Sequence, residues 1–396
     1  MDFADTVEQA AFRLGLRRWL DTNMPKGWAG EESLPADSAE RVAFLRTWQR
    51  RVHEAGWAGL TWPREYGGQG ATLVEQAIFQ EEMVRARAPE LISLVGLNML
   101  GPTLIAYGTE AQKRRHLEPI LSAEELWAQG FSEPDAGSDL ASLRSRAVLD
   151  GDEWMVDAHK VWTTLGQHAR WCELMVRTST GGRKHDGLTC LIVDMESPGV
   201  SVRPIRQIND DTEFSEMFFD GVRVPRDSVL GEVGGGWQIA LATLMHERGT
   251  LGFAFSARNR VVLDRVVALA KAVTRDGRPA IEDLPLRQRL GQLHIEIESM
   301  RLNALGVLSA ADRSDGVPGP EGSILKIQWS DTNQRMQELA LDLLGPDAPL
   351  WGPEGTAGGS WQWGWLRSRA NSIEGGTTQI LLNIVAERVV RLPKPR

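Results

Sequence analysis

Residues 131–140 read FSEPDAGSDL, and they separate two regions of different character. Before them, apolar residues recur at helical spacing, and after them apolar and polar residues alternate as in β-strands. Pro134 and Gly137 predict a loop whose backbone can come close to a ligand, and Ser132 and Ser138 add hydroxyl groups to it. Taken alone, the stretch is better explained as an ordinary loop rich in Gly, Pro and Asp, so its meaning depends on the rest of the chain.

Two further segments give the loop a context. Residues 160–164 read KVWTT, and residues 371–380 read NSIEGGTTQI. Together and in this order, the three segments resemble the acyl-CoA dehydrogenase family of flavoproteins, and the resemblance extends over nearly the whole chain. It implies an α+β fold with an N-terminal α-helical domain over residues 1–127, a middle β-barrel-like domain over residues 128–232 and a C-terminal four-helix bundle over residues 233–396.

Apolar spacing independently predicts helices, then strands, then helices along the chain. Gly108 is expected to end the last helix before the loop, and the three glycines at 234–236 mark the exit from the β region. The start of the β region is placed at residue 128, with residues 126–128 as the end of the preceding helical part. Helices are expected in residues 6–20, 39–55, 73–84, 90–107, 237–272, 286–310, 324–344 and 377–390, and strands in residues 154–158, 188–193 and 217–219.

The composition limits the possible functions. The 396 residues carry 44 Lys and Arg against 53 Asp and Glu, and the net charge of −9 opposes binding to the phosphate backbone of nucleic acids. An apolar run of about 18 residues and a signal peptide are both missing, so membrane insertion is not expected. Cys172 and Cys190 give no disulfide framework, which predicts a reducing, cytoplasmic location.

The resemblance implies FAD as the cofactor, held by side chains and backbone from all three segments. Trp162 would pack on the flavin ring and Thr164 would reach its N5 edge. The alternative interpretations are a core aromatic for Trp162, a strand residue for Thr164 and a helix N-cap at Thr377 or Thr378. The cofactor-binding residues implied by the resemblance are Phe131, Ser132, Gly137, Ser138, Trp162, Thr164, Thr377 and Gln379.

The catalytic base cannot be where many family members have it. Relatives often carry Glu directly before the Gly-Thr pair of the C-terminal motif, but here that position is Gly375. Isovaleryl and long-chain members place the base in a Glu-Arg pair on the first long helix after the β domain, and this chain has Glu247-Arg248 there. The resemblance therefore implies Glu247 as the base, with Arg248 either holding the C-terminal loop or biasing the local charge, while Glu374 stays open as a rival base.

The C-terminal motif at residues 371–380 also implies a backbone hydrogen-bond donor. The N–H of Gly375 would donate one hydrogen bond to the thioester oxygen, and a flavin ribityl hydroxyl would donate the other. A metal is not expected, because His246-Glu247 lacks the second His of a zinc motif.

The leading hypothesis is FAD-dependent α,β-dehydrogenation of an acyl-CoA, or of a carrier-bound acyl thioester, to the 2-enoyl product. Electrons would pass to an electron-transfer flavoprotein, and the chain would form a homodimer or homotetramer. Two alternatives remain open: a flavin oxidase on the same scaffold, and a non-catalytic subunit of a hetero-oligomeric dehydrogenase.

Overall fold

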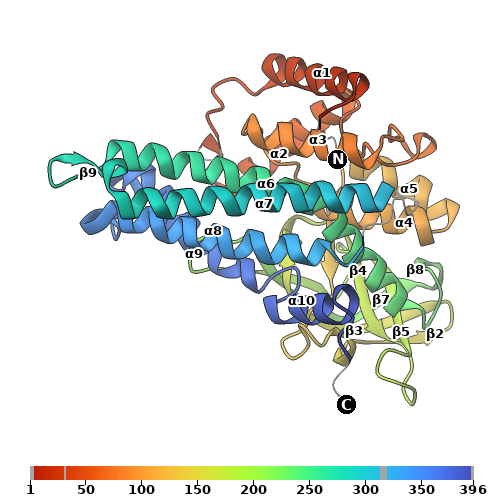
Figure 1. Cartoon of the computed structure of the whole chain (residues 1–396). Helices are drawn as coiled ribbons and strands as arrows, with labels where there is room; N and C mark the ends of the chain where they lie inside the picture. Colours follow the sequence, from red (N-terminus) through yellow and green to blue (C-terminus); the bar gives the residue numbers. More distant parts are fainter. Residues whose placement is uncertain (1–3, 31–32, 313–318, 394–396) are drawn as a thin grey trace. The chain divides into compact units, whose positions relative to one another are not determined.

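The computed structural model describes residues 4–30, 33–312 and 319–393 (Figure 1), without the side chains of residues 247–253, 311, 312 and 353. The chain forms two compact units. The sheet unit comprises Leu34–Thr72 and Pro89–Glu247, and the helical unit comprises Met1–Ser33, Leu73–Ala88 and Arg248–Arg396.

One mixed sheet forms the centre of the sheet unit. Its strands follow the order β6-β7-β3-β2-β4-β5-β8, and β1 pairs with β4 in parallel. The apolar alternation of the strands places one face in a common core, as in β7, where Met217, Phe219, Val222 and Val224 are all buried. The strands are β1 (Trp127–Gly130), β2 (Arg146–Asp150), β3 (Glu153–Thr164), β4 (Trp171–Arg177), β5 (Leu188–Asp194), β6 (Val200–Ile205), β7 (Phe214–Pro225) and β8 (Val229–Leu230).

Two expectations about the approach to this sheet were wrong, and one helix was not predicted. Trp127 lies in strand β1, not at the end of a helix, because it pairs with β4. The helix expected from residue 90 begins later, with a π-helical turn at Gly96–Leu100 that continues into α4 (Gly101–Tyr107) and ends before Gly108 as expected. Helix α5 (Glu110–Leu121) was missed, although Thr109 and Gln112 form a capping box that marks its start.

Further helices complete both units. In the sheet unit these are α2 (Ser38–Glu54) and the beginning of α6 (Gly236–Ala272). In the helical unit the rest of α6 runs beside α7 and α8 (Figure 1), and a buried apolar cluster joins the three helices. The helices of this unit are α1 (Val7–Asn23), α3 (Leu73–Arg85), α7 (Leu284–Asp312), α8 (Gly322–Leu344), α9 (Ser360–Ser368) and α10 (Thr378–Ile384).

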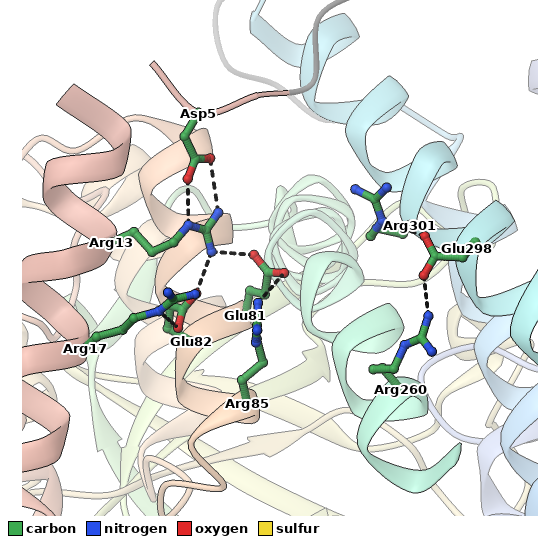
Figure 2. A network of polar contacts seen from close by, with 9 residues as sticks. All are labelled: Asp5, Arg13, Arg17, Glu81, Glu82, Arg85, Arg260, Glu298 and Arg301. Carbon is green, nitrogen blue, oxygen red and sulfur yellow. Dashed lines mark hydrogen bonds and ion pairs between the residues drawn. The ribbon is translucent and has the colours of Figure 1, made fainter. Parts of the chain in front are cut away.

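A charged cluster fastens α1 to α3 in the helical unit (Figure 2). Arg13 reaches Asp5, Glu81 and Glu82, each at 2.6 Å, and Arg17 binds Glu82 at 2.7 Å. The Glu82 side chain is only 4% exposed, so its charge depends on the two arginines. Burial would raise the pKa of Glu82, but hydrogen bonds from Arg17 and Arg13 outweigh it and lower the pKa below 4.5.

We expect Glu82→Gln to lower the free energy of unfolding by about 3 kcal/mol at pH 7, because it removes the buried negative charge that Arg13 and Arg17 pair with. Since the folded pKa lies below the unfolded one, the stability from this carboxylate is present above pH 4.5. It is lost as pH falls through the folded value. Urea unfolding from pH 3 to 7 measures both effects.

The matched control is Asp157→Asn, which removes an exposed carboxylate that pairs with Arg146 at 3.0 Å. An exposed pair contributes about 0–1 kcal/mol, so this variant should unfold nearly like the wild type. Equal losses in the two variants would contradict the role given to Glu82.

Candidate functional site

A buried ion pair anchors the 131–140 loop to strand β3. Lys160 is fully buried, and its Nζ donates to the Phe131 carbonyl at 3.1 Å and to Glu133 Oε1 at 2.8 Å. Glu133 also accepts the backbone N–H groups of Arg144 and Ser145. Burial lowers the pKa of Lys160, while Lys160 and the Arg144 N–H keep the pKa of Glu133 low against the effect of burial. The pair therefore holds Phe131 and Glu133, at the start of the loop, against β3.

A β-bulge turns Trp162 out of the sheet. The register between β3 and β7 shifts between Lys160 and Thr163, and Trp162 has a left-handed backbone with φ of 62°. Its side chain is 60% exposed, which is unusual for the largest aromatic residue. The Val161 N–H donates to the Ser132 carbonyl at 3.0 Å, so a backbone hydrogen bond joins the bulge to the loop. Strain of this kind is typical of sites that present a side chain to a ligand.

The loop leaves space beside it. A Cβ added at Gly137 would meet nothing within 4 Å, and Ser138 is exposed. An open hollow of about 520 Å³ lies next to the loop. It is lined by Glu133, Pro134, Asp135, Ser142, Arg144, Ser145, Asp157, Ala158 and His159.

In the sheet unit, six of the residues singled out from the sequence lie on segments that the structure connects by hydrogen bonds. They lie on two connected segments, the loop and the end of β3. Trp162 is not a core aromatic, which removes the alternative interpretation of that residue. The six residues are Phe131, Ser132, Gly137, Ser138, Trp162 and Thr164.

In the helical unit, the C-terminal motif forms a loop before α10. Gly375 and Gly376 have positive φ values of 59° and 96°, and Gly375 is exposed. The Gly375 N–H makes no hydrogen bond to any residue that the structure describes. Thr377 is the N-cap of α10 and accepts the Ile380 N–H at 3.2 Å, whereas Gln379 is exposed. The motif thus presents a backbone donor and an exposed amide side chain.

Glu374 is engaged inside this loop. Its two carboxylate oxygens bind the guanidinium of Arg367 at 3.1 Å and 3.0 Å. The Asn371 side-chain amide donates to Glu374 Oε1 at 2.9 Å. Both oxygens therefore serve contacts with Arg367 of α9 and with Asn371.

A buried lysine also clamps the loop. Lys326 of α8 donates from Nζ to the Asn371 carbonyl at 2.5 Å and to the Gly376 carbonyl at 2.9 Å. These carbonyls lie on either side of Gly375, so one ammonium group fixes the peptide that carries the free N–H. Lys326 was not identified from the sequence. A single positively charged residue among the apolar positions of α8 could have indicated it.

Glu247 and Arg248 lie within helix α6, but their side chains fall outside those that the structure describes. Position 247 is the last residue of the sheet unit.

The described part of the chain contains no group of three or more His, Cys, Asp or Glu residues that could hold a metal ion. No helix among the described residues is long and apolar enough to cross a membrane.

Comparisons with known proteins identify the family. Models of the acyl-CoA dehydrogenase N-terminal, middle and C-terminal domains match residues 6–124, 128–222 and 234–390. The chain is 40% identical to acyl-CoA dehydrogenase IpdE1 of Mycobacterium tuberculosis, and the match covers 97% of each chain. IpdE1 of Mycolicibacterium smegmatis is 38% identical, with 98% of this chain and 99% of the relative covered.

Similar solved structures support the same family assignment. The Tcur3481-Tcur3483 steroid ACAD superposes with a TM-score of 0.86 at 30% identity, and all of both chains is covered. The ChsE4-ChsE5 complex from Mycobacterium tuberculosis gives 0.85 at 30% identity, again over both whole chains. The predicted α+β fold and the family resemblance are confirmed, while the domain boundaries at residues 127 and 232 stay predictions. The chain belongs to the acyl-CoA dehydrogenase family of flavoprotein oxidoreductases.

Proposed function

We propose that the chain binds FAD and dehydrogenates an acyl-CoA thioester between its α and β carbons, with Glu247 as the base. The single observation that carries the proposal is the exposed Trp162, which a strained bulge holds beside the 131–140 loop. An exposed indole fixed in this way offers a flat surface for a ring system. Bound FAD would supply a hydride acceptor for the β hydrogen.

The residues around Trp162 fit that cofactor. Ser132 and Ser138 offer hydroxyl groups, and the open space at Gly137 allows a ligand to approach the backbone. Thr164 follows the bulge by two residues on the same strand. The Gln129 side-chain nitrogen of β1 is also buried without a partner among the described residues, as expected for a donor whose acceptor comes from a ligand.

Glu247 is the better candidate for the base than Glu374. A base must have an oxygen available to the α hydrogen of the substrate. Both oxygens of Glu374 are taken by Arg367 and Asn371, so neither is available to a substrate. Arg248, next to Glu247, would balance the charge of the base.

The Gly375 N–H would stabilise the thioester oxygen as negative charge develops on it. This N–H has no partner among the described residues, and the positive φ of Gly375 turns the peptide in a way that other residues rarely adopt. One such donor lowers the activation free energy by roughly 3–4 kcal/mol.

The acyl group of the substrate is proposed to be steroid-derived. The support is the likeness over the full chain to a protein described as a steroid ACAD, at 30% identity. The electron acceptor would be an electron-transfer flavoprotein.

An anaerobic panel tests the function. Purified protein with FAD is mixed with butyryl-CoA, octanoyl-CoA and the CoA thioester of a steroid carboxylic acid, and the flavin absorbance is followed. Bleaching by the steroid thioester first and fastest is expected, and no bleaching by any of the three would refute the proposal. Rapid peroxide formation under air would identify an oxidase instead.

A second candidate is a subunit of a hetero-oligomer, because two similar structures are described as pairs of different chains. Native mass spectrometry of the purified chain distinguishes the two states. A homodimer or homotetramer that bleaches with acyl-CoA supports the leading proposal. A monomer that bleaches only after addition of a second acyl-CoA dehydrogenase chain from the same genome supports the hetero-oligomer.

We expect Lys326→Met to lower kcat by about 10- to 100-fold, because a small displacement of a catalytic donor has effects of this size. The variant removes both contacts that fix the peptides on either side of Gly375. FAD content should change little. Steady-state turnover with an artificial electron acceptor measures the loss.

Lys271→Met serves as its control, because Lys271 is an exposed lysine in the last turn of α6. This variant should keep the turnover of the wild type. A wild-type kcat in Lys326→Met would show that the loop holds its position without the lysine.

A further inference from the structure

A buried carboxyl group lies in strand β4 of the sheet unit. Glu173 of β4 is completely buried, and its Oε1 lies 2.8 Å from Thr243 Oγ1 of helix α6. Thr243 Oγ1 also lies 3.1 Å from Thr103 Oγ1 of α4. All three side chains have no exposed surface. The second oxygen, Oε2, has no partner among the residues that the structure describes.

Thr243 connects this group to the proposed base. Position 247 follows Thr243 by four residues in the same α-helix, so the two positions lie one above the other on one helix face. A contact that holds Thr243 therefore sets the height and rotation of the turn that carries position 247. Both positions belong to the sheet unit, as does Glu173.

The hydrogen count favours a carboxyl group that carries a proton. The two threonine hydroxyls also approach backbone carbonyls, Thr243 that of Ile239 at 3.0 Å and Thr103 that of Met99 at 2.8 Å. The cluster thus has four oxygen–oxygen contacts, and two hydroxyls supply only two hydrogens. A proton on Glu173 adds a third hydrogen: the acid donates to Thr243, which is then free to donate to the Ile239 carbonyl.

We infer that Glu173 is a positioning residue for the dehydrogenation, which acts through Thr243 on the helix turn that carries position 247. The inference rests on the proposed function, since it takes position 247 as the site of the base.

The surroundings keep Glu173 without charge at neutral pH. Burial raises the pKa of Glu173 to about 8, and Thr243 and Cys190 only partly oppose this. Among the residues that the structure describes, no cation makes a hydrogen bond or ion pair with Glu173. Cys190 of β5 lies 3.9 Å from Oε1, and burial raises the pKa of its thiol and of the thiol of Cys172, which precedes Glu173 in β4. The other groups around Glu173 are uncharged: Thr243, which Thr103 contacts in turn, and the register partner Gln129 of β1. The cation Lys160 of β3 affects the adjacent Cys172, and it is paired with Glu133.

A pH profile separates this role from a merely structural one. Wild-type kcat is measured from pH 5 to 10 with an artificial electron acceptor and the CoA thioester that bleaches the flavin fastest. Above pH 8, ionised Glu173 can no longer donate to Thr243, and kcat should fall. Glu173→Gln keeps a donor of the same shape without a titration, so it should keep kcat within about threefold at pH 7 and lose the alkaline fall.

Thr243→Val removes the link and keeps the side-chain shape. It should lower kcat about tenfold with an unchanged KM, because the turn that carries the base shifts slightly. The matched control is Thr332→Val in α8, which removes another buried threonine hydroxyl, one that contacts Glu296. An alkaline fall that persists in Glu173→Gln, or a kcat in Thr243→Val equal to that of the control, would overturn the inference.

A measurement without substrate keeps the two proposals distinguishable. Because the folded state holds the proton of Glu173 up to about pH 8 and the unfolded state releases it near 4.5, stability should fall as pH rises between these values. The melting temperature of Glu173→Gln should rise relative to the wild type over this interval. If no CoA thioester is turned over, the proposed function fails while this melting shift still stands. If turnover is normal and the shift is missing, only the role of Glu173 fails.

Discussion

Glu247→Gln should lower the rate of flavin bleaching by acyl-CoA at least about 10³-fold, while the purified variant keeps its full FAD content. A positioned general base contributes about 10²–10⁴ to a rate, and glutamine has the same shape but accepts no proton. The residues proposed to hold FAD lie on the 131–140 loop, on β3 and at the start of α10, so position 247 is not needed for cofactor binding. Anaerobic stopped-flow absorbance of the flavin band measures the loss.

The rival base provides the matched control. Glu374→Gln removes a carboxylate that binds Arg367 and Asn371, so it should loosen the loop and slow bleaching less than about tenfold. If Glu374→Gln abolished bleaching and Glu247→Gln did not, the base would be Glu374. Equal and complete loss in both variants would mean that the two carboxylates act together.

The structure also shows where sequence reasoning succeeds and where it stops. Helices α2 and α3 were placed within one residue of their ends, because apolar spacing and terminal residues are local signals. The place of Trp127 in a strand depends on its pairing with β4, which is about 40 residues further along the chain. Long-range pairing of that kind leaves no local signal.

In the candidate site, too, some residues could be predicted from the sequence and others could not. The loop, Trp162 and Gly375 follow from motif resemblance, but the reason for Trp162's exposure is a bulge that only the pairing of β3 with β7 creates. Lys326 and Glu173 were not found, since a charged residue in an apolar segment is as typical of a surface position as of a buried contact. Their roles became visible only through distances to residues far away in the chain.

The second large effect is expected for Lys160→Met. Removing the cation leaves the Glu133 carboxylate buried without its charged partner, which costs about 3–5 kcal/mol of unfolding free energy. Because Lys160 also holds the Phe131 carbonyl, the loop proposed to contact FAD should loosen, and the FAD content of the purified protein should fall. Chemical unfolding and the ratio of flavin to protein absorbance measure the two effects.

Two variants show whether the buried pair is the cause. Lys184→Met removes an exposed lysine that binds Asp139 at 2.7 Å near the other end of the same loop, and it should change stability by less than about 1 kcal/mol. The double variant Lys160→Met with Glu133→Gln removes both charges, so it should recover part of the lost stability, because no unpaired charge remains buried. Full FAD retention in Lys160→Met would show that the loop keeps its shape through the backbone bond between Val161 and Ser132 alone.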